Sequence, residues 1–516
     1  MATPRSLSPG SIARSLFTLD PDRDERAPQL CAETLLTLAE NGYTAPDDPE
    51  RLRSPKRRRF ALRSLALAHN FLAGDDVPGR AGDDETSVSQ YGQALAEGRE
   101  VRGSANLALA RTTLEGLVDP DTVRGQPGAS LLRPFHESLL WYDARKPSPR
   151  RANYSVRKVY MRGSGITIAR MLADPADPAA AAAGRRAVAE IRQVLTAPSP
   201  LAAISKRLES ALESADAYTS HPDTEVDEIA AWKQGGDPAL AELAGQLCRH
   251  AEGVMLQGGA SGPARLWQLR TVLALDVAVH ALRTAWAATE TPEAERYLLL
   301  SFGGVTRAQD PVRQKSEDSY RRARIRLGDA TVRTLAREMR RLRTENRSRP
   351  WVVEFEPRSG LADDNDPGSV SRRLRVLPAG SAEEEYLKLA RYSVENANYS
   401  RGEDGFRVLL QSVGLLGGTR YPFLTASADL LGALVGALSA EMPLASHDFF
   451  GAVRREWGLV INQETAAGTN LSGQLDGAGL ERNARRAEKL MSQSGLALGL
   501  SDRTTVVGER AQRTRP

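Results

Sequence analysis

The sequence predicts a mainly α-helical protein with several domains, and three features indicate this class. The chain has 516 residues, which is too many for a single hydrophobic core. Hydrophobic residues make up 41% of the chain, enough for packed cores, whereas aromatic residues make up only 5%. Ala, Leu and Arg predominate and runs of β-branched residues are few, so the summed propensities favour helix over strand.

Loop-forming sequences divide the chain into segments. Polar connectors separate short amphipathic helices in the first part, and the last hundred residues differ in pattern from the rest. The predicted segments are an N-terminal helical domain (1–140), a central helical domain (141–350), a linker with a short strand and a helix (351–419), a C-terminal domain (420–510) and a tail (511–516).

Two long helices are expected in the central domain. The most apolar stretch, 266–288, contains charged side chains, which makes a membrane span costly and a buried helix the better prediction. Asp276 and His280 stand four residues apart on it and are expected to form a buried polar pair. Residues 313–343 predict one arginine-rich helix, with Gly328 as the point at which it could bend. Because charged side chains interrupt the most apolar stretch, we expect no contact with a membrane.

The C-terminal domain begins with two predicted helices whose ends are marked by specific residues. Ser427 is expected to cap the first helix, and Ser446 is expected to cap the second. Gly458 is expected to end the second helix, and the short strand 459–461 follows it.

A third helix is predicted at 478–494, and a β-hairpin follows it. Gly495 is expected to end this helix, and two extended pieces then flank the turn Ser501-Asp502-Arg503. Three helices followed by a small hairpin resemble a winged helix-turn-helix domain over residues 420–508. The resemblance implies that the third helix reads DNA, although domains of this kind also mediate protein contacts.

The third helix has two different faces by its sequence. Its apolar positions are expected to point into the core: Leu480, Ala484, Ala487 and Met491. Its basic positions are expected to point away from the core, towards a nucleic-acid groove: Arg482, Arg485, Arg486 and Lys489.

The basic residues of the chain are almost all arginine, with 61 Arg and 8 Lys. The net charge is only +4, so the distribution of charge matters more than the total. Arginine binds phosphate through a bidentate fork and stacks on bases. Three runs are strongly basic: 51–63, 144–173 and 311–349. In the last run, a surface helix with i,i+4 ion pairs is the alternative to phosphate contact.

The run 144–173 contains eight basic residues and no Asp or Glu. Clustered cations with interleaved aromatic rings are typical of nucleic-acid contact. The candidate binding residues are Arg145, Lys146, Arg150, Arg151, Tyr154, Arg157, Lys158, Tyr160 and Arg162. The alternative is docking on an acidic surface, either of a partner or of the chain's own segment 208–244, which has nine acidic residues and one Lys. Both interpretations stay open.

Gly163 and Gly165 in the same run follow a strand-like stretch and precede a helix. A dinucleotide fingerprint would need a third glycine where Ile168 stands, together with a series of alternating strands. A phosphate loop would need a G-K-[ST] sequence, which the chain does not contain. The sequence therefore argues against a nucleotide site, although the two glycines would let backbone N–H groups approach a phosphate at the helix N-terminus.

Sequence patterns of catalysis and metal binding are absent. Cys31 and Cys248 are the only cysteines, so neither a disulfide framework nor a cysteine-ligated zinc site is expected. The six histidines show no metal-ligand spacing, and the Asp-rich stretch 362–368 is better explained as a turn than as a calcium loop. No signal peptide is evident at the N-terminus. We expect a cytoplasmic protein with no cofactor and no metal, and the balance is against an enzyme.

The sequence favours a non-catalytic subunit that binds nucleic acid, DNA rather than RNA, or acts as a scaffold within a bacterial multiprotein assembly. A role in DNA transactions or in antiviral (anti-phage) defence is suggested by analogy with other helical proteins that lack catalytic motifs. Other protein subunits are the expected partners. Two alternatives remain: a protein–protein scaffold without nucleic-acid contact, and an enzyme whose site is assembled from scattered residues.

Overall fold

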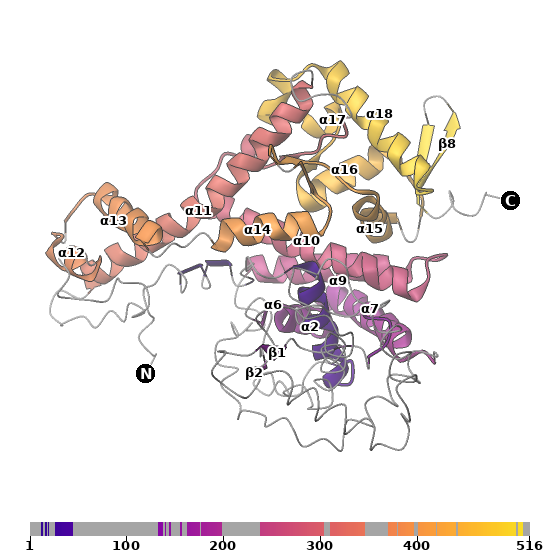
Figure 1. Cartoon of the computed structure of the whole chain (residues 1–516), viewed down its shortest axis with the longest axis horizontal. Helices are drawn as coiled ribbons and strands as arrows, with labels where there is room; N and C mark the ends of the chain where they lie inside the picture. Colours follow the sequence, from indigo (N-terminus) through magenta and orange to yellow (C-terminus); the bar gives the residue numbers. More distant parts are fainter. Residues whose placement is uncertain are drawn as a thin grey trace, which may run out of the picture. The chain divides into compact units, whose positions relative to one another are not determined.

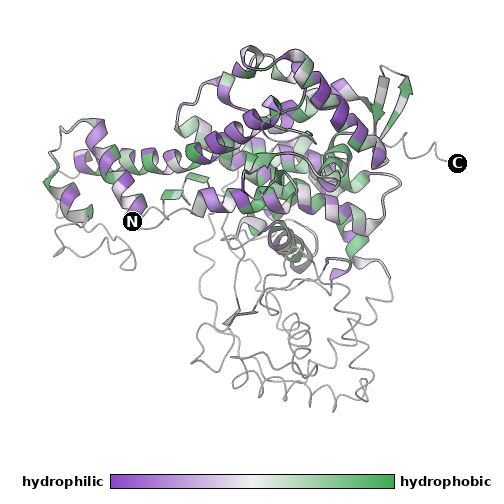
Figure 2. Cartoon of the chain, turned by 45° about the horizontal axis from the view of Figure 1, so that its top comes forward, coloured by the Kyte–Doolittle hydropathy of each residue, from purple (hydrophilic) through white to green (hydrophobic). Residues whose placement is uncertain are grey.

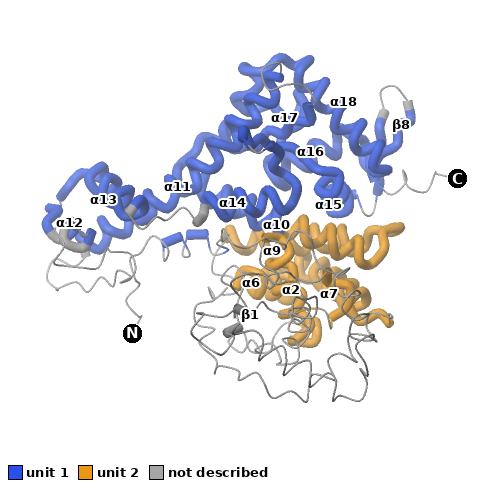
Figure 3. The backbone as a smooth tube through the Cα atoms, in the orientation of Figure 1, with its two compact units in different colours: residues 1–25, 274–516 blue, residues 26–273 orange. Residues whose placement is uncertain are grey.

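The computed structural model describes the chain in eighteen ranges of residues: 12–13, 16–17, 19, 26–44, 133–137, 140, 144–145, 155–156, 163–175, 177–198, 238–303, 310–345, 370–378, 380–396, 401–418, 420–439, 442–501 and 504–508. Two compact units are present (Figure 3): one comprises residues 26–273 and the other comprises 1–25 with 274–516. The predicted division into three domains, a linker and a tail is not tested by this grouping and stays a prediction.

The protein is mainly α-helical, as the sequence predicted (Figure 1). Its described helices carry hydrophobic and hydrophilic residues side by side (Figure 2), the pattern of helices that bury one face. In the described part of the chain the β-structure consists of two-stranded sheets and one three-stranded sheet. None of the described helices is both long enough and apolar enough to cross a membrane.

The unit of residues 26–273 is built from helices that pack through small residues. Its elements are α2 (Ala27–Glu40), β1 (Ala144–Arg145), β2 (Ser155–Val156), α6 (Ser164–Ala173), α7 (Pro178–Thr196), α9 (Pro238–Leu256) and the first part of α10 (Gly262–Ala288). Along α7, Ala183 and Ala187 are buried. A Cβ atom added at Gly184 would lie 2.2 Å from the carbonyl oxygen of Leu172, so a glycine is required where α6 and α7 meet.

In the second unit, α10 continues to Ala288 and is followed by the longest helix, α11 (Pro311–Glu345). Both long helices were predicted. The other elements of this unit before α15 are η6 (Glu293–Glu295), β3 (Leu298–Leu299), α12 (Val370–Val376), α13 (Glu383–Asn396), α14 (Arg401–Ser412), β4 (Leu416–Gly417) and β5 (Phe423–Leu424). Leu335 and Met339 of α11 are fully buried against Tyr386 and Ala390 of α13, so one stripe of α11 forms a core with that helix.

The apolar stretch in α10 is buried, as predicted. Leu273, Val277 and Leu282 have no exposed surface. Asp276 is also buried, and its Oδ1 accepts a hydrogen bond of 2.7 Å from the Nε1 of Trp457. The buried carboxylate therefore has a partner on a helix 181 residues away in sequence.

The C-terminal hundred residues contain the three predicted helices and the predicted hairpin. The elements are α15 (Ala428–Ser439), β6 (Leu444–Ala445), α16 (Ser446–Trp457), β7 (Leu459–Val460), α17 (Gln463–Ala466), η9 (Asn470–Gly473), α18 (Gly477–Gln493), β8 (Ala497–Ser501) and β9 (Thr504–Val507). The hairpin and β6 form an antiparallel sheet in the order β6-β9-β8. Strand β7 pairs in parallel with β3, which joins Leu459 to Leu298 in register.

Specific residues set most of these helix ends. The Oγ of Ser427 accepts a hydrogen bond of 3.1 Å from Leu430 N at the start of α15, which confirms the predicted cap. Gly458 and Gly495 adopt φ angles of 70° and 72°, the left-handed conformation that favours glycine at a helix end. The prediction for Ser446 was wrong, because it is the first helical residue of α16 and its Oγ donates to Glu488 instead.

Candidate nucleic-acid interface

The basic run 144–173 begins with a short hairpin in which Ala144 pairs with Val156 and Arg145 pairs with Ser155. Of the candidate binding residues in this run, Arg145 alone is described, and only its backbone. The others lie outside the described residues: Lys146, Arg150, Arg151, Tyr154, Arg157, Lys158, Tyr160 and Arg162. The basic run 51–63 and nearly all of the acidic segment 208–244 lie outside them as well, so both interpretations of this run stay predictions.

The start of α6 is described, and the chain itself occupies it. Gly163 caps the helix with a φ of 83°, and Gly165 N donates a hydrogen bond of 2.9 Å to the Oε2 of Glu33 on α2. Glu33 has no exposed surface. A carboxylate at a helix N-terminus satisfies an unpaired N–H group and interacts favourably with the helix dipole. The expectation that these N–H groups approach a phosphate is therefore wrong for Gly165, since an internal anion takes that place.

The packing of α6 against α2 requires a glycine at position 165. A Cβ atom at this position would lie 2.7 Å from Glu33 Cβ and 2.8 Å from the carbonyl oxygen of Leu30. Arg170, one of the eight cations of the run, is buried on the same helix, and burial lowers the pKa of its guanidinium. The sequence analysis did not identify Glu33. The one local sign of its role is that it is an acidic residue within the apolar stretch of α2.

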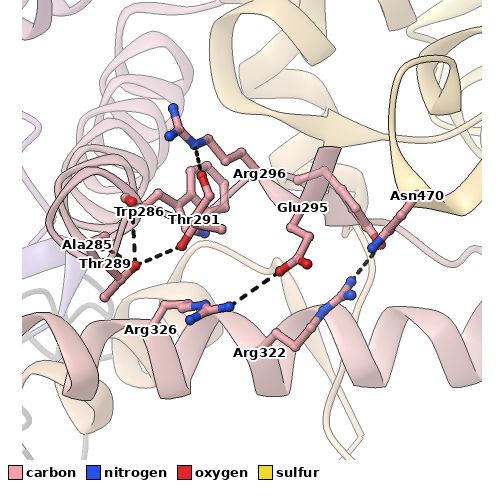
Figure 4. A network of polar contacts seen from close by, with 10 residues as sticks. Ala285, Trp286, Thr289, Thr291, Glu295, Arg296, Arg322, Arg326 and Asn470 are labelled. Carbon is pink, nitrogen blue, oxygen red and sulfur yellow. Dashed lines mark hydrogen bonds and ion pairs between the residues drawn. The ribbon is translucent and has the colours of Figure 1, made fainter. Parts of the chain in front are cut away.

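The arginines of α11 contact acidic and polar groups of neighbouring elements. Arg326 lies 3.4 Å from a carboxylate oxygen of Glu295 (Figure 4). Arg322 donates to the Tyr297 hydroxyl at 2.6 Å. That hydroxyl also donates to Asn470 at 2.5 Å. The guanidinium of Arg322 lies 5.2 Å from the centre of the Tyr297 ring, so a cation–π contact adds to the hydrogen bond.

Further ion pairs involve other arginines of α11 along most of its length. These pairs are Arg313–Glu317, Arg321–Asp318, Arg324–Glu403, Arg337–Glu290, Arg340–Glu383 and Arg341–Glu338. Of the two interpretations of the run 311–349, the described part, 311–345, favours the surface helix with ion pairs. Of the pairs named, only Arg313–Glu317 has the predicted i,i+4 spacing, and several others join α11 to neighbouring elements. Because the neighbouring carboxylates already compensate these guanidinium groups, α11 is a weak candidate for phosphate contact.

Helix α18 is fixed to the unit through the face that the sequence predicted. Leu480, Ala484, Ala487 and Met491 are at most 5% exposed. Asn483, on the edge of this face, is 2% exposed and holds the helix against two strands. Its Oδ1 accepts from Phe302 N at 2.8 Å, and its Nδ2 donates to the carbonyl oxygens of Leu300 and Ile461, each at 2.9 Å. The orientation of α18 about its own axis is thereby determined.

The opposite face of α18 is basic. At about 100° per residue, Lys489 and Arg485 lie roughly 20° and 60° to one side of Arg482, and Arg486 lies roughly 40° to the other side. The four buried apolar residues lie within about 40° of the opposite direction. Arg482, Arg485 and Lys489 are exposed. In the part of the chain that the structure describes, these three cations form no ion pair, in contrast to those of α11.

Arg486 differs from the other three cations. It is half-buried, with 40% of its side chain exposed, and its Nη1 lies 3.8 Å from the Oδ2 of Asp310. The predicted basic face is thus exposed at three positions and directed to an internal carboxylate at the fourth.

The hairpin lies beside α18 and carries an exposed apolar residue. Strand β8 follows α18 after Gly495 and packs against that helix. Leu500, near the end of β8, is 62% exposed. The turn residue Arg503 lies outside the described residues. The hairpin thus carries an exposed apolar side chain on a strand that packs against α18.

Two observations on the described residues concern metal binding and cysteine chemistry. They contain no cluster of three or more His, Cys, Asp or Glu residues that could hold a metal ion. Cys31 and Cys248 are both buried, and burial raises the pKa of the Cys248 thiol to about 12, so at neutral pH this cysteine is a poor nucleophile.

Comparison of the chain with models of known protein families, with curated proteins and with solved structures finds no match.

Proposed function

We propose that the protein is a non-catalytic subunit that binds duplex DNA through α18. One observation carries this proposal: Arg482, Arg485 and Lys489 project opposite the buried face of α18 and have no carboxylate partner in the described part of the chain. Unpaired cations on one face of a rigid helix can neutralise phosphates and release counterions, which supplies most of the affinity for nucleic acid.

The order of the elements around α18 supports a winged-helix-like module. Helices α15, α16 and α18 are followed by the β8–β9 hairpin, and β6, between the first two helices, joins the hairpin at β9. In a helix-turn-helix module the recognition helix enters the major groove, and α18 has the corresponding place in this order. This chain departs from a helix-turn-helix between α16 and α18, where 458–476 contains β7, α17 and η9 in place of a short turn.

DNA fits this surface better than duplex RNA. The major groove of B-DNA is about 12 Å wide and admits a helix, whereas the major groove of A-form RNA is deep and narrow. A helix that presents cations over its outward face needs the wider groove for its side chains to reach phosphates on both sides.

The test is a salt series of binding measurements on the whole chain. Fluorescence anisotropy with a labelled duplex of roughly 20 base pairs gives the dependence of log K on log salt. Replacing Arg482, Arg485 and Lys489 with Ala should lower the magnitude of the slope by about 2.7, or about 0.9 for each phosphate that is no longer neutralised. The affinity at low salt should fall in parallel.

A matched control removes the same charge from α11. The variant R321A/R340A/R341A also removes three positive charges, from exposed positions that are paired with carboxylates. Its slope should stay within experimental error of the wild-type slope. Equal decreases in the two triple variants would mean that net charge, not the face of α18, drives binding.

A protein–protein scaffold is the second candidate, and exposed apolar residues favour it. Ile325 on α11 is 52% exposed and Val376 at the end of α12 is 74% exposed. Ile325 also lines a cleft of about 230 Å³ formed by α11, α13 and α14. If the wild-type chain does not bind the duplex even at low salt, the scaffold function replaces the DNA-binding proposal.

A further inference from the structure

Asp310 is a buried carboxylate with two differently engaged oxygens. Its side chain is 7% exposed. Oδ1 accepts a hydrogen bond of 3.1 Å from Arg313 N and so caps α11. Oδ2 has no hydrogen-bond partner, and the nearest cation to it in the described part of the chain is the Nη1 of Arg486 at 3.8 Å. A buried carboxylate oxygen without a hydrogen bond is costly, and in the described part of the chain this guanidinium is the group that offsets that cost.

The backbone at Gly303 lies against the Asp310 carboxylate. A Cβ atom added at Gly303 would lie 1.9 Å from Asp310 Oδ2 and 3.3 Å from Arg486 Nη1. Gly303 thus provides the space in which the carboxylate and the guanidinium approach each other. The three residues belong to one unit. Gly303 follows β3, Asp310 directly precedes α11, and Arg486 lies on α18.

The pairing has a consequence for the role of Arg486 in binding. Asp310 partly compensates the charge of Arg486, so little counterion release is expected from a phosphate contact at this position. An arginine oriented by a carboxylate keeps other N–H groups available, and its planar fork matches the O6 and N7 acceptors of guanine. Arg482, Arg485 and Lys489 lack such a carboxylate partner among the described residues.

We propose that Asp310 is a positioning residue that withholds Arg486 from phosphate contact and holds it for a base-edge contact with guanine in duplex DNA. This inference rests on the proposed function, because it assigns different roles to cations of the same helix. Three cations of α18 would supply affinity that does not depend on sequence, and the fourth would supply a preference for guanine.

The experiment compares Asp310→Asn, Arg486→Ala and the double variant with the wild-type chain in the same salt series. Asparagine is as good a helix cap as aspartate, so α11 should still begin at the same place. In Asp310→Asn, Arg486 becomes an uncompensated cation, and the magnitude of the slope should rise by about 0.9. In the double variant the slope should return to the wild-type value, and in Arg486→Ala alone it should not change.

A second measurement separates base reading from charge. The proteins are used to select duplexes from a pool whose central base pairs are randomised. The wild-type chain should enrich guanine at one position, and Arg486→Ala should lose that preference while it still binds the unselected pool. Circular dichroism and a melting curve for each variant verify that the fold is retained.

The possible failures are distinguishable. A wild-type chain that does not bind the duplex overturns the proposed function and this inference together. A wild-type chain that binds while Asp310→Asn keeps the wild-type slope overturns the inference alone. Unchanged base selection by Arg486→Ala also overturns it alone.

Discussion

Phosphate contact was expected at both α6 and α18, and the surroundings of these two helices differ. At the start of α6, Gly165 N donates to Glu33, a fully buried carboxylate of the same chain. On the outer face of α18, Arg482, Arg485 and Lys489 are exposed and have no ion pair among the described residues. Basic or glycine-rich sequence therefore indicates an anion site only where the chain's own carboxylates do not already fill it.

Helix α11 extends the comparison. It carries more arginines than α18, yet most of them pair with carboxylates of η6, α13, α14 or their own helix. The number of cations in a helix is thus a poorer guide to function than the acidic residues that surround them in the fold. Among the described residues, the contrast between the paired arginines of α11 and the unpaired cations of α18 can be tested by substitution.

The largest effect is expected where α18 is fixed to the unit. Asn483→Ala removes three hydrogen bonds and leaves the backbone groups Phe302 N, Leu300 O and Ile461 O without that partner. Because each orphaned group costs about 1 kcal/mol or more, the free energy of unfolding should fall by about 3 kcal/mol, measured by urea denaturation. Gln493→Ala, at an exposed position of the same helix, is the control and should change it by less than about 0.5 kcal/mol.

The next effect concerns the start of α6. Gly165→Ala places a methyl group within 2.8 Å of Glu33 and the Leu30 carbonyl, and overpacking of this kind costs about 2 kcal/mol. Denaturation of the whole chain measures the destabilisation. Gly380→Ala is the control, since nothing lies within 4 Å of the added atom. A destabilisation no larger than that of the control would mean that Glu33 does not occupy the helix start.

A smaller effect, dependent on pH, is expected at the pair Arg324–Glu403. Burial raises the pKa of Glu403 above its ordinary value, and the nearby Arg324 opposes this shift. A carboxyl group whose pKa is raised in the folded state binds its proton more tightly there than in the unfolded chain. Its contribution to stability is therefore complete at pH values below the pKa of the unfolded chain. That contribution is lost as the pH rises through the folded pKa.

Glu403→Gln should therefore become more stable relative to the wild type as the pH rises from about 4 to about 7. Melting temperatures of the two proteins across this range give the difference. If the difference does not change with pH, the ionisation of Glu403 does not contribute to the stability of α11 against α14.

The smallest effect is expected at an exposed pair. Arg337 lies 3.2 Å from Glu290, with both side chains at least half exposed. Because solvent screens such pairs, Arg337→Ala should change the free energy of unfolding by less than about 0.5 kcal/mol. The slope of log K against log salt for DNA binding should be the same in Arg337→Ala as in the wild type. In Lys489→Ala the magnitude of this slope should fall by about 0.9.

The features of the fold that depend on local chemistry could be predicted from the sequence. Ser427 caps α15, and Gly458 and Gly495 end their helices, because a short side chain or a glycine is sufficient for each of these geometries. The buried and exposed faces of α18 followed from helical periodicity.

The contacts that decide the candidate site were not visible, because they join distant positions. Glu33 and Gly165 are 132 residues apart, and Asp310 and Arg486 are farther apart still. Ser446 was assigned to a cap from its local sequence, but its hydroxyl is taken by Glu488, 42 residues away. Periodicity tells which face of a helix is polar, and it contains no information about which carboxylate meets that face in the fold.

The parallel pairing of β7 with β3 has a practical consequence for dissecting the molecule. Strand β7 lies between α16 and α18, yet its partner is Leu298–Leu299, far upstream in the chain. A fragment beginning near residue 420 would expose the buried backbone of Leu459 and Val460 and would remove two of the three groups that bind Asn483. Binding experiments on an excised C-terminal piece would therefore report on a helix without its support, and any truncation should retain the chain from α10 onward.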